Sequence, residues 1–123
     1  MKDSSITTRE RLLEIIESID LISSWSENID QPIDFLTTPQ SVMAFNACVM
    51  RLQVIGEHVG KLLKNEANLL EKYNEIPWLA IHDMRNIISH EYSHIDEDVV
   101  YSTIKEDLPV LKSVIEQMLD SKD

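Results

Sequence analysis

The segment that decides the fold is residues 38–65, "TPQSVMAFNACVMRLQVIGEHVGKLLKN". A threonine followed by proline, here Thr38 and Pro39, is typical of a helix start, because threonine caps the first turn and proline fits it. Apolar side chains then recur every three or four residues, the spacing of a helix that packs nearly antiparallel against its neighbours. These positions are Val42, Phe45, Val49, Leu52, Gly56, Val59 and Leu63. The segment therefore predicts one long helix that ends near Asn65.

Gly56 interrupts this apolar face at a cost of about 1 kcal/mol relative to alanine. Such a glycine lets another helix backbone come close, and internal packing is the favoured interpretation. The alternative is a surface where a partner or a second copy of the chain docks.

The segment before it predicts a first helix from about Thr8 to Glu27. Thr7 can cap this helix, and Glu10, three residues later, completes a capping box. The apolar face consists of Leu12, Ile15, Ile19 and Ile22, widened by Ile16 and Trp25.

The segments after it predict one or two short turns and then a third main helix from Pro77 to His90 or Tyr92. A last helix should open at Asp96, because acidic residues favour a helix N-terminus. Pro109 should kink or split this helix, and Asp107 could cap its second half. Its apolar side is expected from Val99, Ile104, Leu108, Leu111, Ile115 and Leu119.

These patterns define the fold class. The chain has only two glycines, and it shows no internal repeat, low-complexity tract or linker. We therefore expect an all-α protein, a four-to-five-helix up-and-down bundle with the last helix kinked near Pro109. A length of 123 residues suits a single domain, residues 1–123.

The compartment is indicated by hydropathy and cysteine content. No N-terminal stretch reads as a signal peptide or a membrane span, because charges break every apolar run. The single cysteine, Cys48, excludes an internal disulfide and is expected to be a small buried hydrophobic residue. We expect a soluble, cytoplasmic protein.

The charge balance limits how the chain could contact nucleic acid. It has 22 acidic and 11 basic residues, a formal net charge of -11. Broad binding to RNA or DNA would need a basic surface, so any contact must be local, through a few cations in a cleft. The alternative is that acidity only keeps the domain soluble.

The third helix, "PWLAIHDMRNIISHEY" at residues 77–92, gathers its polar groups on one face. Asn86 and His90 are four residues apart and can touch. Arg85 and His90 are five apart, about 140° around the helix, so they flank the face. The core side is expected from Ala80, Ile81, Met84, Ile87 and Ile88. The other side is expected from His82, Asp83, Arg85, Asn86, Ser89 and His90, with Trp78 and Leu79.

These residue types can carry acid–base chemistry on a phosphate. A histidine moves protons near neutral pH, and an arginine fork holds a phosphate and stabilises developing charge. Asn86 could orient the His90 ring or a substrate oxygen. No metal-ligand pair appears in this helix, and arginine with histidine suits cleavage of RNA by its own ribose 2′-hydroxyl. The alternative is a solvated helix face on which Arg85 pairs with Asp83 or Glu91.

The same stretch resembles a known family. "RNIISHEY", Arg85 to Tyr92, matches the R-N-x-x-x-H-x-Y signature of HEPN-domain proteins, specifically the HepT-like ribonuclease toxins. "IPWLAIHDMRN" is similar to the family's lead-in to this motif, and "LQVIGEHVGKL" resembles its Gly-Glu segment. The similarity extends from the first helix to the last.

The resemblance implies a function and partners. HEPN domains dimerise so that two R-x-x-x-x-H motifs line one cleft, which would let two copies share the separated Arg85 and His90. HepT-like members are metal-independent RNA endonucleases without a cofactor, paired with a nucleotidyltransferase antitoxin of the MntA type. That partner transfers AMP to the motif tyrosine, here Tyr92, and thereby silences the toxin.

The resemblance also assigns roles. Arg85 would stabilise the pentacovalent phosphate, His90 would act as general acid or base, and Asn86 would position. Glu57 and Ser89 are candidate site neighbours, whereas His58 is expected to be an ordinary packing or surface histidine. The alternative function is a non-catalytic protein that binds a nucleotide or the nucleotidyltransferase.

Overall fold

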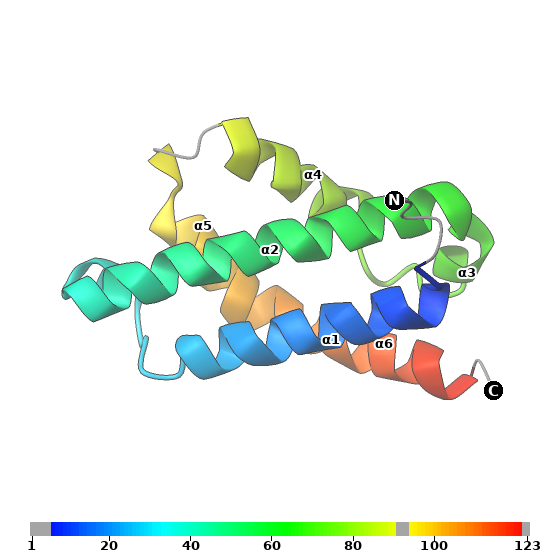
Figure 1. The fold of residues 1–123 in the computed structure, drawn as a ribbon, viewed down its shortest axis with the longest axis horizontal. Coiled ribbons are helices and arrows are strands. Elements are labelled where there is room, and N and C mark those ends of the chain that lie inside the picture. The colour runs from blue at the N-terminus through cyan, green and yellow to red at the C-terminus, as the bar shows by residue number, and fades with distance from the viewer. Residues whose placement is uncertain (1–5, 91–93, 122–123) are drawn as a thin grey trace.

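Helix α2 (Pro39–Asn65) is the centre of the molecule and contacts both α1 (Thr8–Trp25) and α4 (Trp78–His90), which lie on opposite sides of it in Figure 1. The computed structural model describes residues 6–90 and 94–121, with side chains except at residues 86–90. The other elements are a 3-10 helix η2 (Pro32–Leu36), α3 (Ala67–Glu71), α5 (Glu97–Ser102), a π-helical turn η4 (Thr103–Asp107) and α6 (Leu108–Ser121).

Successive long helices alternate in direction, as Figure 1 shows along the blue-to-red path of the chain. The described residues contain no strand. The predicted all-α, up-and-down bundle is therefore confirmed. None of the described helices is long and apolar enough to cross a membrane.

Local capping fixes where α1 begins and ends. The Thr7 Oγ1 accepts the Glu10 N–H at 3.0 Å, and the Glu10 carboxylate accepts the Thr7 N–H at 2.8 Å, so the predicted capping box is confirmed. The helix ends at Trp25, two residues before the predicted Glu27. Ser26 is the C-cap residue, and its backbone N–H and side-chain hydroxyl both donate to the Ile22 carbonyl.

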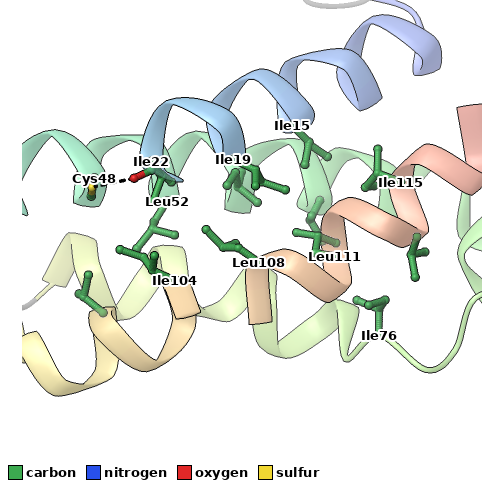
Figure 2. Packing of buried hydrophobic residues seen from close by; sticks show 14 of the residues in the cluster. Ile15, Ile19, Ile22, Cys48, Leu52, Ile76, Ile104, Leu108, Leu111 and Ile115 are labelled. Carbon is green, nitrogen blue, oxygen red and sulfur yellow. Dashed lines mark hydrogen bonds between the residues drawn. The ribbon is translucent and has the colours of Figure 1, made fainter. Parts of the chain in front are cut away.

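The core is shared by α1, α2 and α6 (Figure 2). The predicted apolar faces supply most of it, with fully buried side chains at Leu12, Ile15, Ile22, Val49, Leu52, Val59, Leu111 and Ile115. The thiol of Cys48 is fully buried and donates to the Ile22 carbonyl at 3.9 Å. Burial raises the pKa of the Cys48 thiol to about 11, which agrees with its predicted role as a small buried residue.

The predicted irregularity near Pro109 takes the form of the π-helical turn η4, which leads directly into α6. Proline has no N–H for the carbonyl four residues earlier and its ring crowds that carbonyl, so the turn before it widens. The helical backbone is continuous through Asp107, and the predicted cap at that residue is wrong. The prediction that Val99 lies on the apolar side of the last helix is also wrong, because its side chain is 53% exposed and Val100 is buried instead.

Candidate functional site

Helix α4 packs against α2 at two glycines. A Cβ atom at Gly56 would lie only 2.8 Å from the Cβ of Arg85, and one at Gly60 would lie 2.5 Å from the ring of His82. The His82 Nδ1 is 3.1 Å from the Gly56 carbonyl, a hydrogen bond between the two helices. The two helices approach this closely because neither glycine carries a side chain. Internal packing, the favoured interpretation of Gly56, is confirmed.

The predicted orientation of α4 is right in its middle and wrong at its start. Ile81 and Met84 pack against the core as expected. Trp78, which the helical wheel places with the polar residues but whose size also suits a core edge or a dimer interface, is buried in the core, and Ala80, expected in the core, is exposed. The Trp78 indole N–H donates to the Tyr73 carbonyl at 3.0 Å, so the preceding loop holds the ring inward. The orientations predicted for Ile87 and Ile88 concern side chains outside those described.

Arg85 lies half-buried where α4 crosses α2, directly above Gly56. Its Nε is buried and has no hydrogen-bond partner among the described residues. Arg85 forms no ion pair with Asp83, whose side chain is among those described. Glu91, the second acid expected as a possible partner, lies outside the described residues. Arg85 instead lines a surface cavity of about 530 Å³.

This cavity spans the first turn of α1, the second half of α2 and the middle of α4. It is lined by Ile6, Arg11, Glu57, His58, Gly60, Lys61, Lys64, His82 and Arg85. Among the residues with described side chains, the lining holds four lysines and arginines but only one acidic residue, Glu57. A local cationic cleft was expected if the chain contacts nucleic acid, and the structure places one beside Arg85.

A series of hydrogen bonds links two residues in the wall of the cavity, Arg11 and His58, to Glu14 behind it. The Arg11 guanidinium is 3.1 Å from the His58 Nδ1, and the His58 Nε2 is 2.7 Å from a Glu14 carboxylate oxygen. A guanidinium can only donate, so Nδ1 accepts and Nε2 carries the proton that is donated to Glu14. His58 is buried, as a packing histidine should be, but it also orients Arg11.

The structure brings together some of the predicted site residues. Arg85 and Glu57 line the same cavity. Asn86, Ser89 and His90 occupy the end of α4, but their side chains lie outside those described, and Tyr92 lies outside the described residues altogether. Their roles stay predictions. Among the residues with described side chains, no group of three or more His, Cys, Asp or Glu could hold a metal ion.

Three cations of the cavity were not predicted as site residues: Arg11, Lys61 and Lys64. Lys61 and Lys64 follow Glu57 at spacings of four and three, which places all three on one face of α2. That spacing was a usable signal. The sequence around Arg11 gave no such signal, because only the packing of α1 against α2 brings Arg11 to the cavity.

Comparison with known proteins assigns the family. The family model described as "Ribonuclease HepT-like" matches residues 12–118, most of the chain. The chain therefore belongs to the HepT-like ribonuclease family, and the family expected from the resemblance is confirmed.

Individual relatives agree with this assignment. A "Probable ribonuclease HepT" of Thermococcus cleftensis is 33% identical over 110 residues, covering 89% of this chain and 94% of that protein. A "Gamma-glutamylcyclotransferase and putative RNase" of Methanocaldococcus jannaschii is 32% identical over 112 residues, covering 91% of this chain and 47% of that protein. The chain thus spans about half the length of this second relative. No solved structure matches the chain.

The two glycines give a matched test of how α4 is held. In Gly56→Ala the new methyl group meets the Arg85 Cβ, which cannot move without α4. Overpacking of this kind costs about 1–3 kcal/mol, more than the gain of about 1 kcal/mol in helix propensity. In Gly60→Ala the methyl group meets the end of the His82 side chain, which can rotate away with the loss of its hydrogen bond to the Gly56 carbonyl, at a cost of about 1 kcal/mol. Urea denaturation should show Gly56→Ala to be less stable than Gly60→Ala by about 1 kcal/mol.

The same measurement can contradict this view of the contact. If Gly60→Ala is as destabilising as Gly56→Ala, the Arg85–Gly56 contact does not limit how closely the helices approach.

Proposed function

We propose that this chain is a metal-independent RNA endonuclease and the toxin of a toxin–antitoxin pair. The observation that carries the proposal is the position of Arg85 at the wall of a cation-lined cavity, in a chain whose net charge is -11. A cluster of cations in an otherwise acidic molecule focuses positive potential on one place, where a polyanion can bind. Membership of the HepT-like ribonuclease family supports RNA as that polyanion.

In the proposed reaction RNA supplies its own nucleophile. The ribose 2′-hydroxyl attacks the neighbouring phosphorus, the bond to the 5′ oxygen of the next nucleotide breaks, and a 2′,3′-cyclic phosphate and a 5′-hydroxyl result. Arg85 stabilises the charge on the pentacovalent phosphate. His90 moves the proton, as base toward the 2′-hydroxyl or as acid toward the departing oxygen. Asn86 positions the His90 ring or a phosphate oxygen.

A homodimer completes the proposed site. Arg85 and His90 are separated by about 140° around one helix, so two copies related by a two-fold axis would bring both groups to each side of one strand. An apolar stripe on α2 supports such a contact: Met43 is 71% exposed and Met50 is 56% exposed. Glu57 lies seven residues after Met50, on the same side of α2, and it lines the cavity. The apolar stripe therefore ends at the edge of the cavity.

Cleavage of RNA in the presence of excess chelator tests the proposal. Arg85→Ala and His90→Ala should each lower the cleavage rate about 100-fold or more, because each removes a group that acts on the transition state. Lys112→Ala is the matched control; it removes a cation that pairs with Asp20, and its rate should equal that of the wild type. Circular dichroism verifies that all three variants fold.

The alternative function predicts a different result. The acidity of the chain favours a non-catalytic protein that binds a nucleotide or the nucleotidyltransferase. In that case purified wild type leaves RNA intact, and the endonuclease proposal fails.

We further propose that an MntA-type nucleotidyltransferase silences the chain by transferring AMP to Tyr92. A bulky anionic group two residues from His90 would fill the cleft and repel RNA phosphates. The other two tyrosines are engaged within the fold: the Tyr101 hydroxyl donates to the Asp30 carbonyl at 2.6 Å, and the Tyr73 hydroxyl lies 3.3 Å from that of Ser121.

Mass spectrometry after co-expression with such a nucleotidyltransferase should therefore find AMP on the peptide that contains Tyr92. The Tyr92→Phe variant should carry no AMP and should keep its ribonuclease activity in the presence of the partner. AMP on Tyr101, or an unmodified Tyr92 peptide, would contradict the assignment.

A further inference from the structure

Arg11 is the least expected residue of the cavity, because it is a cation that is 8% exposed and has no carboxylate partner. Among the described residues, the ion pair of Lys112 with Asp20 and the hydrogen bond from the neutral His58 ring to Glu14 both leave Arg11 without a directly bonded carboxylate. The described partner of Arg11 is the neutral Nδ1 of His58. Burying a guanidinium without a counter-charge is unfavourable, so this site is suited to receive an anion from outside.

The hydrogen bonds from Arg11 to His58 and from His58 to Glu14 keep Arg11 buried without a direct ion pair. Glu14 binds the far side of the His58 ring, at Nε2, and does not reach Arg11 as an ion-pair partner. His58 therefore fixes the direction of the Arg11 guanidinium without neutralising its charge. The positive charge that faces the cavity stays available to a ligand.

Two further cations, Lys61 and Lys64, line the same cavity. Lys61 and Lys64 are exposed on one face of α2, and neither forms an ion pair within the described part of the chain. Glu57, one turn earlier, is the single acid in the lining and opposes them in part. The positive charges in the lining outnumber this one negative charge, so the cavity favours an anionic ligand. Its volume of about 530 Å³ falls within the range of ligand sites.

We propose that Arg11, Lys61 and Lys64 form a subsite for a second, non-scissile phosphate of the RNA strand. The inference rests on the proposed function, because RNA is the substrate that places a second phosphate here. Arg85, the proposed ligand of the scissile phosphate, lines the same cavity, so one strand could contact both places. The subsite fixes the strand relative to Arg85, and Glu14 and His58 act as positioning residues for Arg11.

Salt-dependent binding of an uncleavable RNA tests the subsite. The probe is a fluorescent 2′-O-methyl oligonucleotide, whose blocked 2′ position prevents cleavage, and anisotropy measures its affinity over a range of salt concentrations. Each phosphate contact to a single strand contributes about 0.7 to the slope of log K against log salt. Lys61→Ala and Lys64→Ala should each weaken binding and lower the slope by about 0.7.

Arg11→Gln should have the same effect on the slope, and circular dichroism shows whether it folds. If this buried variant does not fold, the two exposed lysine variants still decide the question. Lys112→Ala is the control, because it changes the net charge by the same amount on the α1–α6 side of the molecule. Its slope should equal that of the wild type.

The outcomes separate this inference from the proposed function. Equal slopes for Lys61→Ala, Lys64→Ala and Lys112→Ala would overturn the subsite even if the wild type cleaves RNA. Failure of the wild type to bind the probe would overturn it as well. Lowered slopes in the lysine variants support the subsite even if the wild type cleaves no RNA, a result that removes only the endonuclease proposal.

Discussion

The close contact between α2 and α4 at Gly56 and Gly60 is the constraint on which the candidate site depends. It places the Cβ of Arg85 directly above Gly56 and the ring of His82 against Gly60. The hydrogen bond from His82 to the Gly56 carbonyl fixes the two helices along their axes. Because the first residue of the motif is held in this way, a cavity is left open between α4, α2 and the start of α1.

The charges of the lining residues indicate what the cavity could bind. A molecule with a net charge of -11 should repel RNA, yet the described residues that line this cavity include four cations and a single acid. Arg11 is held there by a neutral histidine, and the Glu14 carboxylate binds the far side of that ring. The same arrangement that limits non-specific binding would allow one strand to bind in one place, which agrees with a selective nuclease.

Local signals predicted the fold well. The capping box of Thr7 and Glu10, the Thr38 start of α2 and the irregularity before Pro109 each depend on neighbouring residues, and sequence spacing reveals them. The errors arose where contacts outside the helix itself determine the position of a residue. The preceding loop holds Trp78 inward, although the helical wheel places it with the polar residues, and the packing of α1 against α2 brings Arg11 to the cavity. Gly56 pointed to a close helix contact, but the sequence could not show that Arg85 was the residue above it.

Single-turnover cleavage of RNA by Gly56→Ala, in excess chelator, tests the central claim most directly. This variant keeps Arg85, Asn86, His90 and Tyr92 and changes only the contact that positions the motif helix. The account predicts that the folded variant cleaves RNA far more slowly than the wild type, whereas Lys112→Ala, which leaves the contact between α2 and α4 intact, cleaves at the wild-type rate. Cleavage by folded Gly56→Ala at the wild-type rate would contradict the account.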